Sequence, residues 1–460
     1  MKQLLLALAL ISGVAVAQPT HVDPAALRDR ALQDDTAWTI VRDLTTEIGP
    51  RLAGTNAEAR ARDWAVVRLK SLGFKNVRVE PFEIEGWQRG IERGEVLQPF
   101  PQPLVLTALG RSGPTPTGGL SGEVMGFGSV AELEAAPAAA IRGKIVFVWH
   151  RMGVSQDGSS YGAFHAVRTQ APAIAAGKGA MAVLIRSVGT SGDRLAHAGA
   201  TRWPDGQKPI PAAALSVPDA EQLERMLSTG KSVSVKLTLT PRFTGKQTSG
   251  HVIAEIPGHD PDAGMVLIGG HLDSWDLGTG AIDDAAGVAI TAAAARLVGQ
   301  AGTPLRTVRL VWFGSEEFGP EGAEAFYEAH RSDEYVVAAE SDFGADRIWK
   351  LDTRVSDPTN PAIQRLESLL RPLGIARGNN EARGGADISP FKGDGTPIVS
   401  LTQDGTRYFD LHHTANDTLD KVDSSQLRQN VAAWVALVAV AANDPEWPKK
   451  PDIQRKTAAK

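Results

Sequence analysis

Residues 265–284 read MVLIGGHLDSWDLGTGAIDD, and this stretch decides the fold. The apolar run from Met265 to Gly270 is typical of a short buried strand, and it ends directly before His271. After a polar loop, the apolar run from Ala285 to Val298 is typical of a buried helix. A buried strand that leads through a loop into a buried helix predicts the beginning of a β-α-β unit.

The same alternation continues toward the C-terminal end of the chain. Further strands are predicted at Thr307 to Phe313, Val336 to Glu340 and Pro397 to Leu401, and further helices at Gly322 to His330, Pro361 to Leu373 and Ser424 to Ala442. Short apolar strands separated by helices predict an α/β fold whose central sheet is mostly parallel and flanked by helices. Ligands of such sheets bind beyond the carboxyl ends of the strands, so that edge is where chemistry is expected.

The first half of the chain predicts a second unit. Two helices and a strand are expected at 35–47, 56–72 and 77–84, and a Pro- and Gly-rich crossing follows at 99–116. From about residue 118 to 240, short β-like runs alternate with an Ala-rich helix, and candidate metal ligands are sparse. We therefore expect one domain in two parts, residues 24–117 and 241–445. An inserted α/β domain, residues 118–240, lies between these parts, and residues 446–460 form a C-terminal tail.

Composition narrows the possible functions. The chain has 460 residues and a formal net charge of −5, with no basic stripe, so nucleic acid is a poor candidate partner. A chain of this length favours two folded units. Cysteine is absent, which excludes disulfides and thiol nucleophiles and restricts any metal site to His, Asp and Glu.

The first residues indicate export. A positive start at Lys2 precedes an apolar run from Leu4 to Val16, and small residues end the segment at Ala17. This pattern predicts a signal peptide over residues 1–17 and a secreted or periplasmic protein. A membrane anchor is the weaker alternative, because the run is shorter than the roughly 20 apolar residues that span a bilayer. We expect no stable membrane anchor.

Acidic residues and histidines gather where the predicted strands end. His271 and Asp273 follow the first strand, Asp283-Asp284 open the next helix, Glu316-Glu317 follow the second strand, Asp342 follows the third, and His412-His413 lie in a late loop. Each alone has a structural explanation, such as a helix cap for the aspartates or a satisfied buried histidine. Together, two imidazoles and three carboxylates can hold two divalent ions with one carboxylate bridging, and nitrogen with oxygen ligands suits zinc.

These motifs resemble the dizinc aminopeptidase and glutamate carboxypeptidase family. The resemblance rests on His271 to Ser274, Gly280 to Asp284, Ser315 to Glu317, Glu340 to Asp342 and His413-Thr414, and covers the chain from about Asp35 to Ala442. The stretch from Gly269 to Asp284, with Trp275-Asp276 inside it, is most similar to the glutamate carboxypeptidase branch. The resemblance identifies the inserted segment as a protease-associated domain and implies two zinc ions per chain.

The resemblance also implies a role for each residue. His271 and Asp342 would bind one zinc ion, Glu317 and His413 the other, and Asp283 both. Glu316 would be the general base, and Asp273 would orient His271. A cis peptide bond is implied between Asp283 and Asp284. His412 stands where many aminopeptidases of the family have a tyrosine that stabilises the oxyanion, and Asp387 lies in a segment similar to one near the family's substrate pocket.

The expected activity is the hydrolysis of a terminal peptide bond in dipeptides or short peptides. Two alternatives are a binding protein that has kept the peptidase fold and a one-zinc glutaminyl-cyclase-like transferase. The complete ligand set argues against both. The sequence leaves open which peptide terminus is held. Arg383 is either a binder of a substrate carboxylate or, as most arginines are, a surface residue. The inserted domain is expected either to limit access to the site or to contribute to a homodimer.

Overall fold

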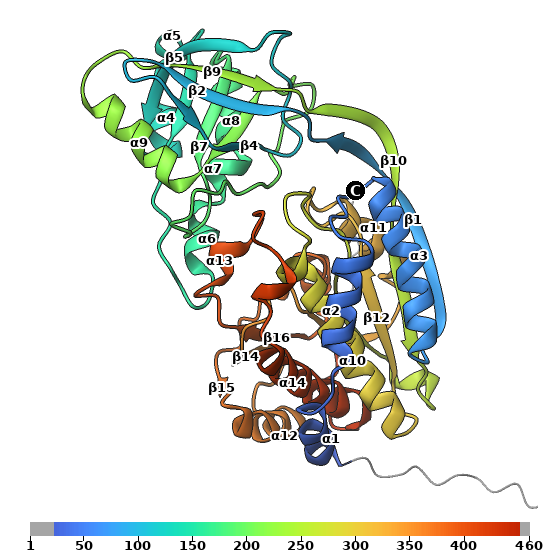
Figure 1. Cartoon of the computed structure of the whole chain (residues 1–460). Helices are drawn as coiled ribbons and strands as arrows, with labels where there is room; N and C mark the ends of the chain where they lie inside the picture. The colour runs from blue at the N-terminus through green and yellow to red at the C-terminus, as the bar shows by residue number, and fades with distance from the viewer. Residues whose placement is uncertain (1–22, 451–460) are drawn as a thin grey trace, which may run out of the picture.

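The computed structural model describes residues 23–450 and contains two β-sheets, one in each of two regions (Figure 1). The predicted signal peptide over residues 1–17 and the last residues of the predicted tail, 451–460, lie outside the described residues. Within the part that is described, no helix combines the length and the apolar character needed to cross a membrane.

The first sheet is the predicted central sheet of the α/β fold. Its eight strands lie in the order β1 (Lys75–Gln88), β10 (Arg242–Ile256), β12 (Thr307–Phe313), β11 (Met265–His271), β13 (Tyr335–Glu340), β16 (Ile398–Gln403), β14 (Ile348–Arg354) and β15 (Ala376–Arg377). Four central strands run parallel to one another: β12, β11, β13 and β16. Strand β10 pairs antiparallel with β12, and β14 pairs antiparallel with β16. The carboxyl ends of the parallel strands therefore meet at one edge.

Helices cover both faces of this sheet. They are α1 (Pro24–Ala31), α2 (Thr36–Glu47), α3 (Asn56–Ser71), α10 (Ala286–Ala301), α11 (Glu321–His330), α12 (Pro361–Leu370) and α14 (Ser424–Asn443), with short 3₁₀ turns η1 (Pro261–Ala263), η3 (Arg371–Leu373), η4 (Ser389–Asp394) and η5 (Leu419–Lys421). Alternate strand residues enter two cores, as the period of two in a strand requires. Ile268 packs into the core with α10 and α14, and Leu267 into the core with Phe326 of α11.

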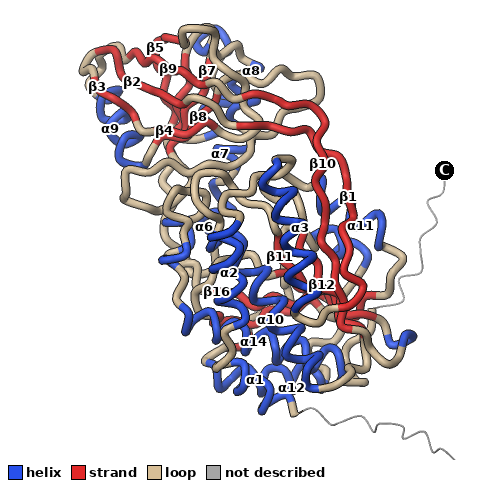
Figure 2. The backbone as a smooth tube through the Cα atoms, turned by 45° about the vertical axis from the view of Figure 1, so that its right-hand side comes forward, coloured by secondary structure: helices blue, strands red, loops and turns tan. Residues whose placement is uncertain are grey.

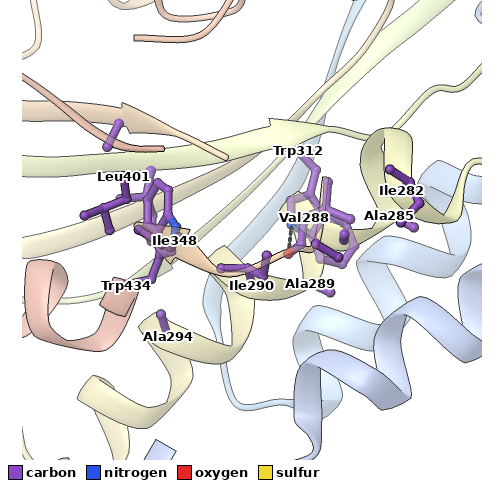
Figure 3. Packing of buried hydrophobic residues seen from close by; sticks show 14 of the residues in the cluster. Ile282, Ala285, Val288, Ala289, Ile290, Ala294, Trp312, Ile348, Leu401 and Trp434 are labelled. Carbon is purple, nitrogen blue, oxygen red and sulfur yellow. Dashed lines mark hydrogen bonds between the residues drawn. The ribbon is translucent and has the colours of Figure 1, made fainter. Parts of the chain in front are cut away.

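Helix α10 is almost entirely buried, and alanine or glycine occupies nine of its sixteen positions. Small side chains let it pack closely against the sheet and against α14 and α2 at once. Trp312 of β12 packs on this helix, and its indole N–H donates a 3.1 Å hydrogen bond to the carbonyl oxygen of Val288 (Figure 3). The polar end of a buried tryptophan is thereby satisfied inside the core.

The second sheet belongs to the inserted region. Its eight strands lie in the order β3 (Gln102–Leu104), β2 (Glu92–Gln98), β9 (Ser234–Leu239), β5 (Leu120–Phe127), β6 (Ile145–Val148), β7 (Ala182–Arg186), β8 (Ala212–Leu215) and β4 (Leu106–Ala108). Its helices are α4 (Val130–Ala135), α5 (Ala138–Ile141), α6 (Ser159–Phe164), α7 (Ala166–Thr169), α8 (Ala171–Gly177) and α9 (Val217–Ser228). We call this region, residues 92–239, the inserted module.

The second sheet begins earlier in the chain than the predicted insertion, which started at residue 118. The Pro- and Gly-rich segment that indicated a crossing instead contributes the two short strands β3 and β4. These strands form the two edges of the sheet. Proline is tolerated in an edge strand because no neighbouring strand on the outer side needs the N–H that proline lacks, so Pro103 fits in β3.

A long antiparallel ribbon joins the two regions. Strands β1 and β10 pair from Lys75 with Glu255 to Gln88 with Arg242, and Figure 2 shows them running side by side from the central sheet to the inserted module. The chain enters the module at the end of β1 and returns through β10. The first half of β10 is mostly exposed and polar, which is why its sequence did not predict a strand.

The inserted module lies against α13 (Tyr408–Leu411) of the other region (Figure 1). The ring of Tyr161 in α6 stacks on Phe409 with centroids 4.8 Å apart. The hydroxyl of Thr190 donates a 2.7 Å hydrogen bond to Asp410 Oδ1. These contacts hold the module over the loop that continues from α13 into His412 and His413.

Candidate metal centre

The predicted site residues come together at the carboxyl edge of the central sheet. His271 is the last residue of β11, Glu316 and Glu317 follow β12, and Asp342 follows β13. The others are Asp283, in the turn η2 (Ala281–Ala285) before α10, and His412 and His413 directly after α13. Parallel strands deliver their ends to the same edge, which explains how residues from distant parts of the chain meet.

Asp283 lies between two groups of potential ligands. Its Oδ1 is 3.0 Å from His271 Nε2, and the same nitrogen is 3.5 Å from Asp342 Oδ1. Its Oδ2 is 3.2 Å from His413 Nε2, which is 3.0 Å from Glu317 Oε2. One carboxylate thus presents an oxygen to each of two His–carboxylate pairs.

The other ring nitrogens of the two histidines face backbone carbonyls. His271 Nδ1 lies 3.0 Å from the carbonyl oxygen of Asp273, and His413 Nδ1 lies 3.2 Å from that of Ala198 in the inserted module. Carbonyl oxygens only accept, so each Nδ1 must carry the proton when it bonds there. Each Nε2 faces the carboxylate cluster, and once it has lost its proton its lone pair is available to a metal ion.

Asp273 contacts two parts of the site. Its main-chain oxygen contacts the His271 ring, whereas its carboxylate Oδ1 is 3.7 Å from that ring. The carboxylate instead accepts hydrogen bonds from the backbone N–H groups of Glu316 and Glu317, at 3.1 and 3.3 Å. Asp273 therefore positions the glutamate pair as well as the histidine.

Three further buried residues hold the loop that carries Asp283. Arg51 donates to the carbonyl oxygens of Leu272, Gly49, Thr279 and Gly280. Asp417 accepts from the N–H groups of Ile282 and Asp283, and Asp284 accepts from those of His271 and Gly287. The peptide bond between Asp283 and Asp284 is cis, which confirms the expectation. The contacts of Arg51 depend on tertiary structure, and the sequence offered no signal for its role.

The centre concentrates acidic groups in a buried place. Burial and the neighbouring carboxylates of Asp342 and Glu317 raise the pKa of Glu316 well above its usual range. Burial, followed by the charge of Asp342, raises the pKa of Glu340 to about 8. Burial opposes ionisation of Asp283 too, but the imidazoles of His271 and His413 beside its two oxygens hold its pKa well below the usual range. Carboxylates crowded in this way favour binding of cations.

The residues fit divalent metal ions. Among the residues described, three groups place ligand atoms within 4.8 Å of one another: Asp283 with His412 and His413, His271 with Asp284 and Asp342, and His271 with Asp283 and Glu317. Asp283 Oδ2 is buried and accepts no hydrogen bond in the described part of the chain, so it is free for another ligand. Imidazole and carboxylate donors in a buried cluster suit zinc. Asp284 was not a predicted ligand, and its carboxylate is occupied by backbone N–H groups.

The remaining candidates lie around the same place. The ring of His412 stacks on that of His413 with centroids 3.5 Å apart, and its Nε2 is 3.7 Å from Asp283 Oδ2. Asp387 is fully buried, and neither of its carboxylate oxygens has a hydrogen-bond partner among the described residues. Arg383 is exposed and lines a neighbouring cavity of about 350 Å³ rather than the cavity at the metal centre.

A cavity of about 450 Å³ opens over the centre. Asp283, Glu316, Asp342 and His413 line it from the loops at the edge of the central sheet, and Tyr161, Arg168 and Arg202 line it from the inserted module. The site is therefore enclosed by both regions of the chain. A cavity of this size can hold a small molecule or a short peptide.

Comparison with known proteins assigns the family. Residues 251–438 match the description "Peptidase family M28". Carboxypeptidase Q of Bos taurus is 35% identical over 403 residues, which are 87% of this chain and 84% of that protein. Carboxypeptidase Q of Homo sapiens is 34% identical over 403 residues, with the same coverage of 87% and 84%.

Solved structures agree with this assignment. A peptidase M28 precursor from Shewanella amazonensis is 44% identical, with a TM-score of 0.89 over 91% of this chain and 96% of that one. A zinc aminopeptidase from Bacillus subtilis shares the fold at 21% identity, with a TM-score of 0.65 over 90% of this chain and 98% of that one. The chain belongs to peptidase family M28 and is a metallo-exopeptidase similar to carboxypeptidase Q.

Proposed function

We propose that this protein is a zinc-dependent exopeptidase that hydrolyses the terminal peptide bond of dipeptides or short peptides with two zinc ions per chain. The position of Asp283 carries the proposal, because its two oxygens face His271 with Asp342 on one side and His413 with Glu317 on the other. A carboxylate that contacts two sets of ligands is what a bridged pair of ions requires. Zinc ions at this place would supply Lewis-acid polarisation of the carbonyl and make water more acidic.

The proton transfers are assigned to Glu316. Its carboxylate lines the cavity and makes no hydrogen bond with the described residues, whereas its backbone N–H is fixed by Asp273. This side chain takes a proton from the attacking water and passes it to the leaving amine. His412 lines the same cavity and is proposed to donate a hydrogen bond to the oxyanion.

Metal content and peptide cleavage test the proposal together. We expect the purified protein to hold about two zinc ions per chain, measured by mass spectrometry of the metal, and to release free amino acids from a panel of dipeptides. A chelator should stop the release, and added zinc should restore it. A peptide with an N-terminal glutamine serves as the control for the cyclase alternative. Absence of bound zinc combined with no restoration by added zinc would contradict the proposal.

Export of the protein is a second proposal, based on the apolar segment that follows Lys2. The mature protein should begin at Gln18, which N-terminal sequencing of protein from the periplasm or culture medium checks. Protein that keeps Met1 would contradict it. The homodimer stays a prediction, for which sedimentation of the mature protein is the measurement.

A further inference from the structure

A second cavity, of about 350 Å³, adjoins the cavity at the metal centre. We call it the side cavity. The two cavities share part of their lining, because Asp157, Gly158, Asp342 and Phe343 contribute to both. Most of the remaining lining comes from strands β14 and β16 and from residues 379–385. A substrate held at the metal centre is therefore next to the side cavity.

Glu340 is a buried carboxylate in the wall of the side cavity. It is the last residue of β13 and is 7% exposed. Its Oε2 accepts a 3.1 Å hydrogen bond from the backbone N–H of Ile388. Its Oε1 is buried and has no hydrogen-bond partner among the described residues. A buried acceptor without a partner is costly, so Oε1 points to a donor that is present during function.

The loop that packs against Glu340 keeps this carboxylate in a fixed orientation. A Cβ at Gly385 would lie 2.1 Å from Glu340 Cδ, so any other residue at this position would displace the carboxylate. The backbone N–H of Gly384 donates a 3.2 Å hydrogen bond to Ser400 Oγ, which ties the loop to β16. Glu340 is therefore held by the loop on one side and by Ile388 on the other.

The charged side chains of the side cavity favour a cation. Lys350 and Asp352 pair with each other at 2.9 Å, so their charges offset one another. Apart from the proposed metal ligand Asp342, the other charged groups of the lining are three carboxylates and one guanidinium: Asp157, Glu340, Glu381 and Arg383. Of these four, only Glu340 is buried. The excess of negative charge attracts a positively charged group.

A basic side chain explains this arrangement better than a metal ion does. Among the described residues, none of the three groups of potential metal ligands includes Glu340. A lysine or arginine side chain carries its charge several bonds away from the peptide bond, and the side cavity lies beside the metal centre at a comparable remove. Ser400 and Thr402 add hydroxyl oxygens to the lining that can accept further N–H bonds.

We propose that the side cavity binds the side chain of a lysine or arginine residue next to the scissile bond, with Glu340 as the specificity-determining residue. This inference rests on the proposed function. The ammonium or guanidinium group donates a hydrogen bond to Glu340 Oε1, and the exposed carboxylate of Glu381 adds a weaker attraction. The preferred substrates are then dipeptides or short peptides with a basic residue beside the bond that is cleaved.

The test compares lysine with norleucine, which has a side chain of similar length without the charge. Both orders are measured: lysyl-alanine against norleucyl-alanine, and alanyl-lysine against alanyl-norleucine. In one of the two orders, wild type should cleave the lysine peptide with a kcat/KM about 10–100-fold higher, which is the size of one hydrogen bond between charged groups. The difference should lie mainly in KM, because the contact is made by the bound substrate as well as in the transition state.

Two variants assign this preference to the side cavity. Glu340→Gln should reduce the preference for lysine to less than about threefold and keep the wild-type zinc content, because the charge is removed while the shape is kept. Glu381→Lys, at an exposed position, should reduce the preference by about two- to fivefold, as expected for an exposed charge. The control Glu328→Lys makes the same charge reversal at an exposed position of α11 and should keep the wild-type preference.

Equal kcat/KM for lysine and norleucine peptides in both orders would overturn the inference. A preference that Glu340→Gln leaves unchanged would overturn it too, and zinc loss in that variant would assign Glu340 to the metal centre instead. If the zinc-loaded wild type cleaves no peptide at all, the proposed function fails. Calorimetry with free lysine and free norleucine then still decides the role of the side cavity: tighter binding of lysine that Glu340→Gln removes would support it, and equal binding would overturn it.

Discussion

Replacement of Glu316 by Gln should lower kcat by about 10²–10⁴-fold and leave the zinc content unchanged. Glutamine has the same shape as glutamate and keeps the backbone N–H bond to Asp273, but its amide cannot accept and return a proton. The loss should appear in kcat rather than in KM, because the group acts on the proton in the transition state. Steady-state cleavage of a dipeptide and metal analysis on the same preparation measure both quantities.

The matched control is Glu328→Gln, which changes an exposed glutamate that pairs with Arg331 on the surface of α11. Its kcat should equal that of wild type. If Glu316→Gln retained kcat within about threefold, Glu316 would not be the base, given the usual size of general-base effects. If the variant lost zinc, Glu316 would be a ligand instead.

Replacement of Asp283 by Asn should remove most of the bound zinc and nearly all activity. Asp283 places one carboxylate oxygen 3.0 Å from His271 Nε2 and the other 3.2 Å from His413 Nε2. Asparagine keeps the shape while removing the charge and one of the two acceptor oxygens. Even residues that only orient ligands cost 10–100-fold in metal affinity, so we expect a loss of more than about 100-fold here. Competition with a coloured chelator measures the affinity.

Thermal unfolding with and without zinc gives an independent measurement. An ion at 100 times its Kd stabilises a folded protein by about 2.7 kcal/mol, so zinc should raise the Tm of wild type and leave that of Asp283→Asn nearly unchanged. Asp262→Asn, an exposed aspartate in η1, is the control that should retain the zinc-dependent rise. Full zinc occupancy in Asp283→Asn would contradict the bridging role.

The inserted module is part of the metal centre rather than a separate attachment. The match to the M28 family spans residues 251–438 and contains all the predicted ligands. The backbone of Ala198 nevertheless exchanges two contacts with His413, a 2.8 Å hydrogen bond from its N–H to the His413 carbonyl and the contact of its own carbonyl with Nδ1. Similarly, His197 Nδ1 lies 2.8 Å from the carbonyl oxygen of His412. The module therefore orients a proposed metal ligand in the site that it covers.

Much of the central sheet was predictable because its strands are short, apolar and buried on both faces. The run at Met265 predicted β11 to within one residue, and the run at Thr307 predicted β12 fully. Strand β10 was missed because half of it is exposed and pairs mainly with β1, so it carries no apolar run. Strands β3 and β4 were missed because edge strands admit proline and can be only three residues long.

The sequence by itself determined which residues gather at the metal centre. His271, Glu317 and Asp342 each follow a parallel strand, and the topology of such sheets brings strand ends to one edge whatever the length of the connections. Only the tertiary structure decided what surrounds them. Arg168 and Ala198 reach His413 from 245 and 215 positions away, through the packing of one region on another. Such contacts depend on shape across an interface and not on local periodicity, so no pattern in the sequence records them.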